Sequence, residues 1–220
     1  MLTVHHLENS RSQRVLWLLE EWGVPYTVKR YERDPKTMLA PDALRAIHPL
    51  GKSPVIEDDG VIVAETGAIL DYLSERYGEG RLVPPAGSAE ARAMTYWLHY
   101  AEGSAMTPLL MKLVFTRLPE NAGPLVRPLV RGVSKKALSG FVDPRLAEHV
   151  DYWEAKLAAT GWFAGPEMTL ADIMMSFPLE AATSRAGAGD KPNIAAFLER
   201  IHARPAWQRA LEKGGPYAYA

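Results

Sequence analysis

The chain has 220 residues, of which 47% are hydrophobic and 23% charged, with a formal net charge of −1 and no cysteine. This composition is typical of a globular protein with one large or two small domains, and it lacks the broad basic field that a nucleic-acid partner requires. The absence of cysteine excludes a disulfide framework, a thiolate metal site and a cysteine nucleophile, so any reactive thiol must arrive with a ligand.

Strand and helix patterns alternate through residues 1–78, in the order β-α-β-α-β-β-α. The clearest helical run is SRSQRVLWLLEEWG at residues 10–23, which a glycine ends. The clearest hairpin is SPVIEDDGVIVAE at residues 53–65, which turns at Asp-Gly and leads into an amphipathic helix that ends at Gly78. This order predicts a thioredoxin-like α/β domain, a small mixed sheet with helices on its faces.

Residues 79–88 are rich in glycine and proline and have no periodicity, so they predict a linker. From residue 89 to 220 the patterns are helical throughout, which predicts an all-α helical bundle as the second domain. Within residues 117–143, Arg127, Arg131 and Lys135 are spaced four apart and predict one basic helix face. We interpret this face as solvated, with a site for an acidic substrate as the alternative.

A metal site and a membrane span are not expected. His5 and His6 are adjacent in a predicted strand, so their side chains face opposite sides and do not ligate one metal together. The apolar runs are far shorter than the ~20 residues that a membrane-spanning helix needs. The first ten residues, MLTVHHLENS, have no signal-peptide pattern, and we therefore expect a cytoplasmic protein.

Thr169 and Asp172 stand three residues apart before an apolar run. This T-x-x-D spacing predicts a capping box at the start of a buried helix. Because the structural role explains the spacing fully, we do not interpret Asp172 as a catalytic acid.

The two-part plan and three motifs resemble the cytosolic glutathione transferase family. The motifs are NSRSQRVLWLLEE at residues 9–21, HPLGKSPVIEDDGVIVAETGAILDYL at residues 48–73 and FAGPEMTLADI at residues 163–173. The NSRSQR loop is most similar to a fungal and bacterial branch of serine-type members. The resemblance implies the glutathione transferase fold and an enzyme that conjugates the glutathione thiolate to hydrophobic electrophiles, with glutathione as co-substrate. A glutathione-dependent peroxidase or isomerase, or a non-catalytic binding module, are the alternatives.

By this resemblance, Ser10 is the residue that activates the glutathione thiol, and Ser12 is the cap of the first helix. Ser12, Asn9 and Arg11 remain alternative activating groups. The sequence has no tyrosine between Leu2 and Trp22, so a tyrosine-type mechanism has no candidate here.

The resemblance also assigns the charged contacts of glutathione. Thr66, at a helix N-terminus suited to anions, would hold the α-carboxylate of the γ-glutamyl residue, and Glu65 would pair with its ammonium. Lys52 would reach the glycyl carboxylate, with Lys36 as a possible helper.

The peptide backbone of glutathione is assigned to the start of the third strand. The resemblance implies a cis bond between Ser53 and Pro54. Val55 would then offer its backbone to the cysteinyl amide of the ligand, as an added strand does.

The resemblance places the electrophile against the first helices of the second domain. Most apolar residues there are interpreted as core or dimer interface, and four are assigned to the pocket: Tyr100, Met106, Met111 and Phe115. The family resemblance further implies a homodimer in which the α/β domain of one chain meets the helices of the other.

Overall fold

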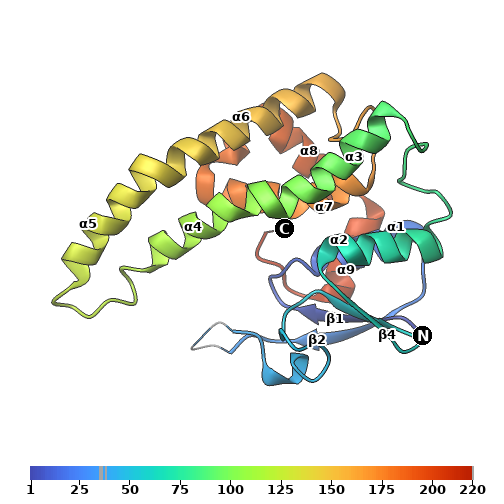
Figure 1. The fold of residues 1–220 in the computed structure, drawn as a ribbon, viewed down its shortest axis with the longest axis horizontal. Helices are drawn as coiled ribbons and strands as arrows, with labels where there is room; N and C mark the ends of the chain where they lie inside the picture. Colours follow the sequence, from blue (N-terminus) through green and yellow to red (C-terminus); the bar gives the residue numbers. More distant parts are fainter. Residues whose placement is uncertain (35–36, 38, 220) are drawn as a thin grey trace.

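Figure 1 shows the computed structural model of the chain, which describes residues 1–34, 37 and 39–219. The sheet lies at one end, with α1 (Gln13–Trp22) and α2 (Thr66–Leu73) close to it. The later helices extend away from the sheet, and the last one, α9 (Pro205–Gly214), returns to lie against α1. The predicted architecture, a thioredoxin-like α/β part followed by a helical part, is confirmed.

The sheet is mixed and has the strand order β2-β1-β3-β4. The central strand β1 (Thr3–Leu7) runs parallel to β2 (Thr27–Tyr31) and antiparallel to β3 (Val55–Asp58). A turn at Asp59-Gly60 then connects β3 to β4 (Val61–Ala64), and these two strands are antiparallel. The predicted βαβ unit and hairpin are therefore both present.

The helical part begins at Ala89. Its helices are α3 (Ala89–Tyr100), α4 (Met106–Arg117), α5 (Arg127–Ala137), α6 (Asp143–Thr160), α7 (Leu170–Ala186), α8 (Pro192–His202) and α9. Short π-helical turns follow α2, join α3 to α4 and join α5 to α6, at Ser74–Gly78, Ala101–Ala105 and Leu138–Val142, and 3₁₀ turns occur at Asp42–Leu44 and Ala188–Asp190.

Helix α1 is buried on nearly all sides because the sheet, α7 and α9 surround it. Its C-terminus has the glycine stop that the sequence predicts: Gly23 has a φ of 67°, and its N–H donates to the carbonyl of Leu19. Trp17 meets Trp207 of α9 edge to face, with ring centroids 5.1 Å apart. One continuous apolar cluster thus runs through both parts of the chain, and the division at residues 79–88 stays a prediction.

Helix α7 begins with the predicted capping box. The hydroxyl of Thr169 accepts a hydrogen bond from the Ala171 N–H at 3.2 Å, and Asp172 Oδ2 accepts one from the Thr169 N–H at 2.7 Å. Burial raises the pKa of Asp172 to about 6, against the opposing effect of the N–H groups of Phe163 and Thr169 that donate to it. The capping box is confirmed, and Asp172 is fully buried in a structural role.

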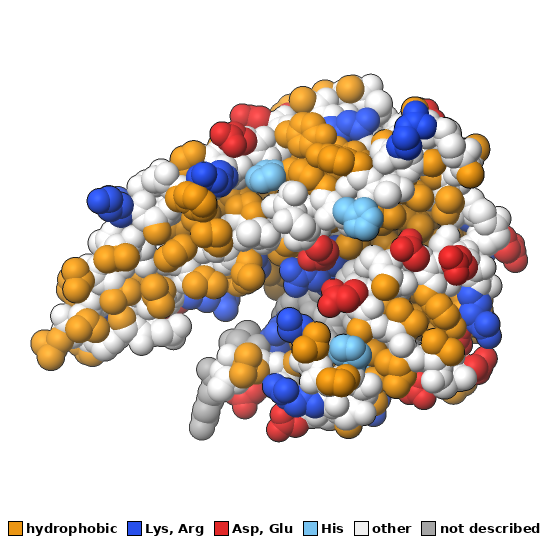
Figure 2. Space-filling model, viewed as in Figure 1, with side chains coloured by type: hydrophobic (Ala, Val, Ile, Leu, Met, Phe, Trp, Pro, Cys, Tyr) orange, Lys and Arg blue, Asp and Glu red, His pale blue; other side chains and the backbone are white. Residues whose placement is uncertain are grey.

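Helices α4 and α5 project from the body of the molecule and form an arm (Figure 1). The basic residues Arg127, Arg131 and Lys135 are exposed on α5, as the predicted solvated face requires. Apolar side chains are exposed on the same arm, among them Leu125 and Leu129 with 97% and 72% of their surface accessible, and Figure 2 shows apolar atoms along it. None of the helices in the described ranges has the length and apolar character to cross a membrane.

Candidate functional site

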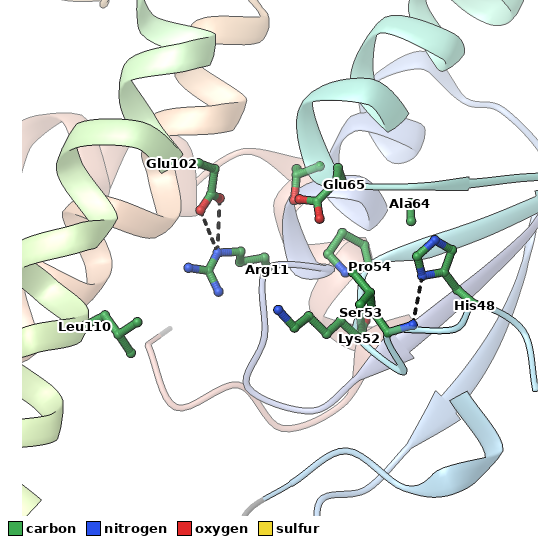
Figure 3. Close-up of a pocket in the computed structure, with 11 residues that line it drawn as sticks. Arg11, His48, Lys52, Ser53, Pro54, Ala64, Glu65, Glu102 and Leu110 are labelled. Carbon is green, nitrogen blue, oxygen red and sulfur yellow. Dashed lines mark hydrogen bonds and ion pairs between the residues drawn. The ribbon is translucent and has the colours of Figure 1, made fainter. Parts of the chain in front are cut away.

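A cavity of about 330 Å³ lies between the α/β part and the helical part. Its lining residues are Arg11, His48, Leu50, Lys52, Ser53, Pro54, Ala64, Glu65, Thr66, Glu102 and Leu110. Glu102 and Leu110 come from the π-helical turn before α4 and from α4 itself, and the others come from the α/β part, as Figure 3 shows. The site is therefore polar on the sheet side and gains both a carboxylate and an apolar side chain from the helices.

The structure brings five of the sequence-predicted glutathione ligands together in this cavity: Lys52, Ser53, Pro54, Glu65 and Thr66. The Ser53–Pro54 peptide bond is cis, which is the isomer that the resemblance implies. The predicted helper Lys36 lies outside the described residues.

Val55 does not line the cavity. It is buried at the start of β3, where it is in register with His5 of β1 on one side and Ala64 of β4 on the other. β3 therefore has a neighbouring strand on both sides at Val55. A ligand can reach the backbone of Val55 only at the end of the strand, beside Pro54.

Ser53 is held in place by β1. Its hydroxyl donates to the carbonyl of His5 at 2.8 Å and accepts from the N–H of Leu7 at 3.2 Å. These two bonds attach the start of β3 to the last residues of β1, and so place Pro54 and Lys52 at the cavity.

Glu65 precedes α2 in a left-handed backbone conformation, with φ 71° and ψ 125°. A left-handed φ is costly for a residue with a side chain, and such strain tends to occur at functional sites. Glu65 is exposed at the cavity, whereas Thr66, the first residue of α2, is buried. The strained residue thus presents a carboxylate next to a helix N-terminus.

An ion pair that the sequence motifs do not indicate joins the two walls of the cavity. Arg14 is only 1% exposed, and its guanidinium donates to Glu102 Oε1 at 2.6 Å, Thr66 Oγ1 at 3.0 Å and the carbonyl of Met174 at 2.8 Å. Arg11 Nε also donates to both oxygens of Glu102, at 3.1 and 3.0 Å. The sequence did contain a signal for this pair. Arg14 lies four residues before Leu18, on the same helix face, so a charged side chain stands among the buried residues of α1 and needs a partner.

Arg14 and Glu102 each favour the charged form of the other. Burial alone would raise the pKa of Glu102, but the charges of Arg14 and Arg11 and their hydrogen bonds outweigh it and lower the pKa below its ordinary value. Burial lowers the pKa of Arg14, and Glu102 opposes that shift. Glu102 is therefore an anion at neutral pH, and one of its two cationic partners lines the cavity beside it.

The residues of the loop that precedes α1 differ in whether they reach the cavity. Arg11 lines the cavity, whereas Asn9, Ser10 and Ser12 do not. Asn9 has a φ of 48°, and its Oδ1 accepts from the N–H of Ala218 at 2.7 Å. The C-terminal segment is thus hydrogen-bonded to this loop at Asn9.

Ser12 is not a side-chain cap of α1, and that expectation is wrong. Its hydroxyl instead lies 2.9 Å from His6 Nδ1 and 3.3 Å from the carbonyl of Leu7. Ser10 Oγ accepts the N–H of Ser12 at 3.2 Å, within the turn that precedes α1. The Ser10 hydroxyl is 6% exposed and lies 2.7 Å from the hydroxyl of Ser12.

None of the four residues assigned to the electrophile pocket lines the cavity. Tyr100 is buried among aromatic rings and accepts a hydrogen bond from Trp153 Nε1 at 3.1 Å. Met106 is buried in the core, and Met111 and Phe115 pack against it. Leu110 is the residue of α4 that reaches the cavity, and helical periodicity alone does not distinguish it from its neighbours.

The described residues show no cluster of metal-ligating side chains. Within residues 1–34, 37 and 39–219, no three His, Asp or Glu side chains gather closely enough to hold an ion. The polar groups of the cavity are instead suited to an organic ligand that carries both carboxylates and an ammonium group.

Comparisons with known proteins agree on one family. Residues 10–76 match the model of the glutathione S-transferase N-terminal domain, and residues 106–205 match that of the C-terminal domain. The chain is 38% identical to glutathione S-transferase 3 of Schizosaccharomyces pombe, over 97% of this chain and 88% of that protein. It is 30% identical to glutathione S-transferase 1 of Saccharomyces cerevisiae, over 97% and 95%. A solved glutathione S-transferase from Actinobacillus pleuropneumoniae superposes with a TM-score of 0.84 and 32% identity, over 100% of this chain and 95% of that one.

Proposed function

The chain belongs to the cytosolic glutathione S-transferase family and is a glutathione transferase, and from that premise we propose that the cavity between its two parts is the glutathione site. The observation that carries the proposal is the meeting of Lys52, Glu65 and Thr66 in one cavity. These residues supply a cation, an anion and a helix N-terminus, which match the charged groups of the tripeptide.

The γ-glutamyl end of glutathione has an ammonium and a carboxylate on one carbon. The exposed carboxylate of Glu65 suits the ammonium, and the first N–H groups of α2 at Thr66 suit the carboxylate. Lys52 then pairs with the glycyl carboxylate as a point charge. The backbone of Val55 takes the cysteinyl amide at the end of β3, beside Pro54.

The cysteinyl thiol of the ligand must be ionised to react, and a free thiol has a pKa of ~8.5. We propose Ser10 as the group that lowers this pKa, by donating its hydroxyl to the thiolate close to the N-terminus of α1. Ser10 keeps 6% of its surface accessible, whereas Ser12 has none. Arg11 is the main alternative because it lines the cavity and carries a positive charge. Asn9 is less suited, because it does not line the cavity and the bond that its Oδ1 accepts from Ala218 holds its side chain at the C-terminal segment.

The electrophile takes the apolar side of the cavity, where Leu110 of α4 faces the sheet (Figure 3). This location moves the predicted pocket by one helical turn from Met106 and leaves Tyr100 in the core. Holding the thiolate and a hydrophobic electrophile next to each other supplies proximity, and the hydroxyl supplies anion stabilisation. A role in detoxification is consistent with this chemistry.

The test is a conjugation assay with chlorodinitrobenzene on Ser10→Ala and Arg11→Ala. We expect Ser10→Ala to lower kcat/KM roughly 10²-fold, as loss of one donor to a developing anion does, and to raise the pKa of the bound thiol. Ser139→Ala, on an exposed turn after α5, is the matched control. Unchanged activity in Ser10→Ala together with loss in Arg11→Ala would transfer the role to Arg11.

We also propose a homodimer that uses the arm formed by α4 and α5. Leu125, Leu129 and Val133 are exposed there, and apolar patches of this kind mark interaction sites. Analytical ultracentrifugation of the chain and of Leu129→Glu tests the assembly, and a monomeric unaltered protein would refute it. A cytoplasmic location stays a prediction.

A further inference from the structure

Arg11 stands in the wall of the cavity with its guanidinium held from two directions. Its Nε donates to both oxygens of Glu102, at 3.1 and 3.0 Å, and its Cζ lies 5.4 Å from the centre of the Phe177 ring. The first contact fixes one edge of the planar group, and the second supports one of its faces. Arg11 therefore has a defined direction, although 36% of its side chain is exposed.

The outer edge of this guanidinium, which carries Nη1 and Nη2, is available to a ligand. Among the described residues, neither of these two nitrogens donates to another group of the protein. Figure 3 shows them in the cavity, turned away from Glu102 and on the side of Leu110 in that view. Two parallel N–H groups on one edge are the arrangement that binds a carboxylate through two hydrogen bonds.

The charges around the cavity leave one cation in excess once glutathione is placed as proposed. Glu65 pairs with the ammonium of the ligand, and Lys52 and the N–H groups of α2 pair with its two carboxylates. What remains is a single carboxylate, Glu102, shared by the guanidiniums of Arg14 and Arg11 at 2.6 and 3.0 Å. The net charge of this remaining group is positive, which favours an anion beside it.

A third guanidinium strengthens this preference. Arg33, which follows β2, lies near enough to Arg11 for the two like charges to repel each other, and the main opposing charge at Arg33 is that of Glu8. An anion bound at Arg11 relieves this repulsion. A sulfur anion is a single atom without a planar pair of acceptors for two N–H groups, whereas a carboxylate has such a pair.

Two leucines of the cavity supply an apolar surface for the rest of a substrate. Leu50 comes from the α/β part and Leu110 from α4, and they are 57% and 54% exposed. Covering them with an apolar group removes this surface from water and so favours binding. The lining thus combines an apolar surface with one directed cation.

We propose that Arg11 selects electrophiles that carry a carboxylate on an apolar body, and that it binds this carboxylate through Nη1 and Nη2. The inference rests on the proposed placement of glutathione and names the class of the second substrate. Glu102 and Phe177 are positioning residues that hold the guanidinium in the required direction. This role concerns which substrate is bound, and it is separate from any effect of Arg11 on the ionisation of the thiol.

The test compares substrates that differ in one charge. Two isomers of chlorodinitrobenzoate carry the carboxylate ortho or para to the chlorine, and the two corresponding benzamides are neutral. In all of them the thiolate sulfur bonds to the ring carbon and chloride leaves. Each kcat/KM is divided by the rate constant of the same compound with glutathione alone, which removes the difference in intrinsic reactivity.

We expect the unaltered protein to prefer at least one benzoate over its benzamide by about tenfold, the effect of one charge-assisted contact. Arg11→Gln should abolish this preference. Arg11→Lys keeps the charge but lacks the two parallel N–H groups, and should show a smaller preference than the unaltered protein. Arg92→Gln is the control, because Arg92 is exposed and lies outside the cavity lining, and it should change neither the preference nor the activity.

Equal normalised rates for each benzoate and its benzamide in the unaltered protein would overturn the proposal. A preference that survives in Arg11→Gln would also overturn it, and loss of that preference in Lys52→Gln would then transfer the carboxylate to Lys52.

The preference also separates this inference from the proposed function. It is a ratio measured on one variant, so a change in thiol ionisation or in glutathione binding cancels from it. If Arg11→Gln lowers the rates of all four compounds equally, Arg11 acts on the thiol and only the substrate role is refuted. If calorimetry shows that the unaltered protein does not bind glutathione, the proposed function fails and the inference fails with it.

Discussion

The two segments that we assign to the glutathione site are held in different ways. Residues 53–66 are organised mainly by the β3–β4 hairpin and the start of α2, which are local elements, and contacts of Ser53 with β1 and of Thr66 with Arg14 attach them to the rest of the fold. The loop of residues 9–12 is held from far away: Arg11 bonds Glu102, 91 positions on, and Asn9 bonds Ala218, 209 positions on. The segment that lines the cavity can therefore be recognised largely from local sequence, whereas the geometry of the loop before α1 depends on the whole fold.

Arg14 connects these two segments, and its removal should have the largest effect. Arg14→Leu deletes the bonds to Thr66, Glu102 and Met174 together. We expect the free energy of unfolding to fall by about 3 kcal/mol, the low end for a buried pair, because Glu102 is one-third exposed and keeps Arg11 as a partner. Glutathione affinity should fall with it. Urea unfolding and calorimetry measure the two effects.

The control for Arg14 is an arginine that makes only a surface contact. Arg92 is exposed and bonds the carbonyl of Gly87 at 2.8 Å. Arg92→Leu should stay within about 0.5 kcal/mol of the unaltered protein. If Arg14→Leu behaved in the same way, the two segments would not depend on each other through this residue.

A loss of folding stability at acid pH should come from His6 in β1. Burial, followed by the charge of Arg30, lowers the pKa of His6 from 6.5 to about 4 in the folded chain. Between pH 6.5 and pH 4 the unfolded chain therefore binds a proton at His6 that the folded chain does not bind. Stability from this group is therefore complete above pH 6.5 and is lost as the pH falls toward 4, by about 3 kcal/mol for 2.5 pKa units.

The measurement is urea unfolding of the protein and of His6→Gln at several pH values. The stability difference between them should shrink by that amount from pH 7 to pH 4, because glutamine does not titrate. A difference that stays constant with pH would mean that His6 ionises equally well in the folded and unfolded chains.

The limits of sequence-based prediction follow the same division. Lys52, Glu65 and Thr66 could be predicted to lie together because the motif that carries the family resemblance is a hairpin and a helix start, which are encoded locally. The cap role of Ser12 was wrong because the alternative partner, His6, becomes a neighbour only when β1 packs beside the loop. Tyr100 was assigned to the pocket on a helical pattern that core and cavity residues share. Its packing against Trp153 of α6 places it on the core face of α3.

The smallest effect, and the one of opposite sign, should come from the strained residue of the local segment. The positive φ of 71° is sterically unfavourable for Glu65 because its side chain begins with a Cβ. Gly has no Cβ and adopts a positive φ readily. Glu65→Gly should therefore leave the fold as stable or about 1 kcal/mol more stable, while glutathione affinity falls about tenfold from the loss of a charge-assisted contact. Glu79→Gly is the matched control, because Glu79 is exposed with a φ of 51° and lies outside the cavity lining. It should leave glutathione affinity unchanged, so equal affinity losses in both variants would contradict a ligand role for the Glu65 carboxylate.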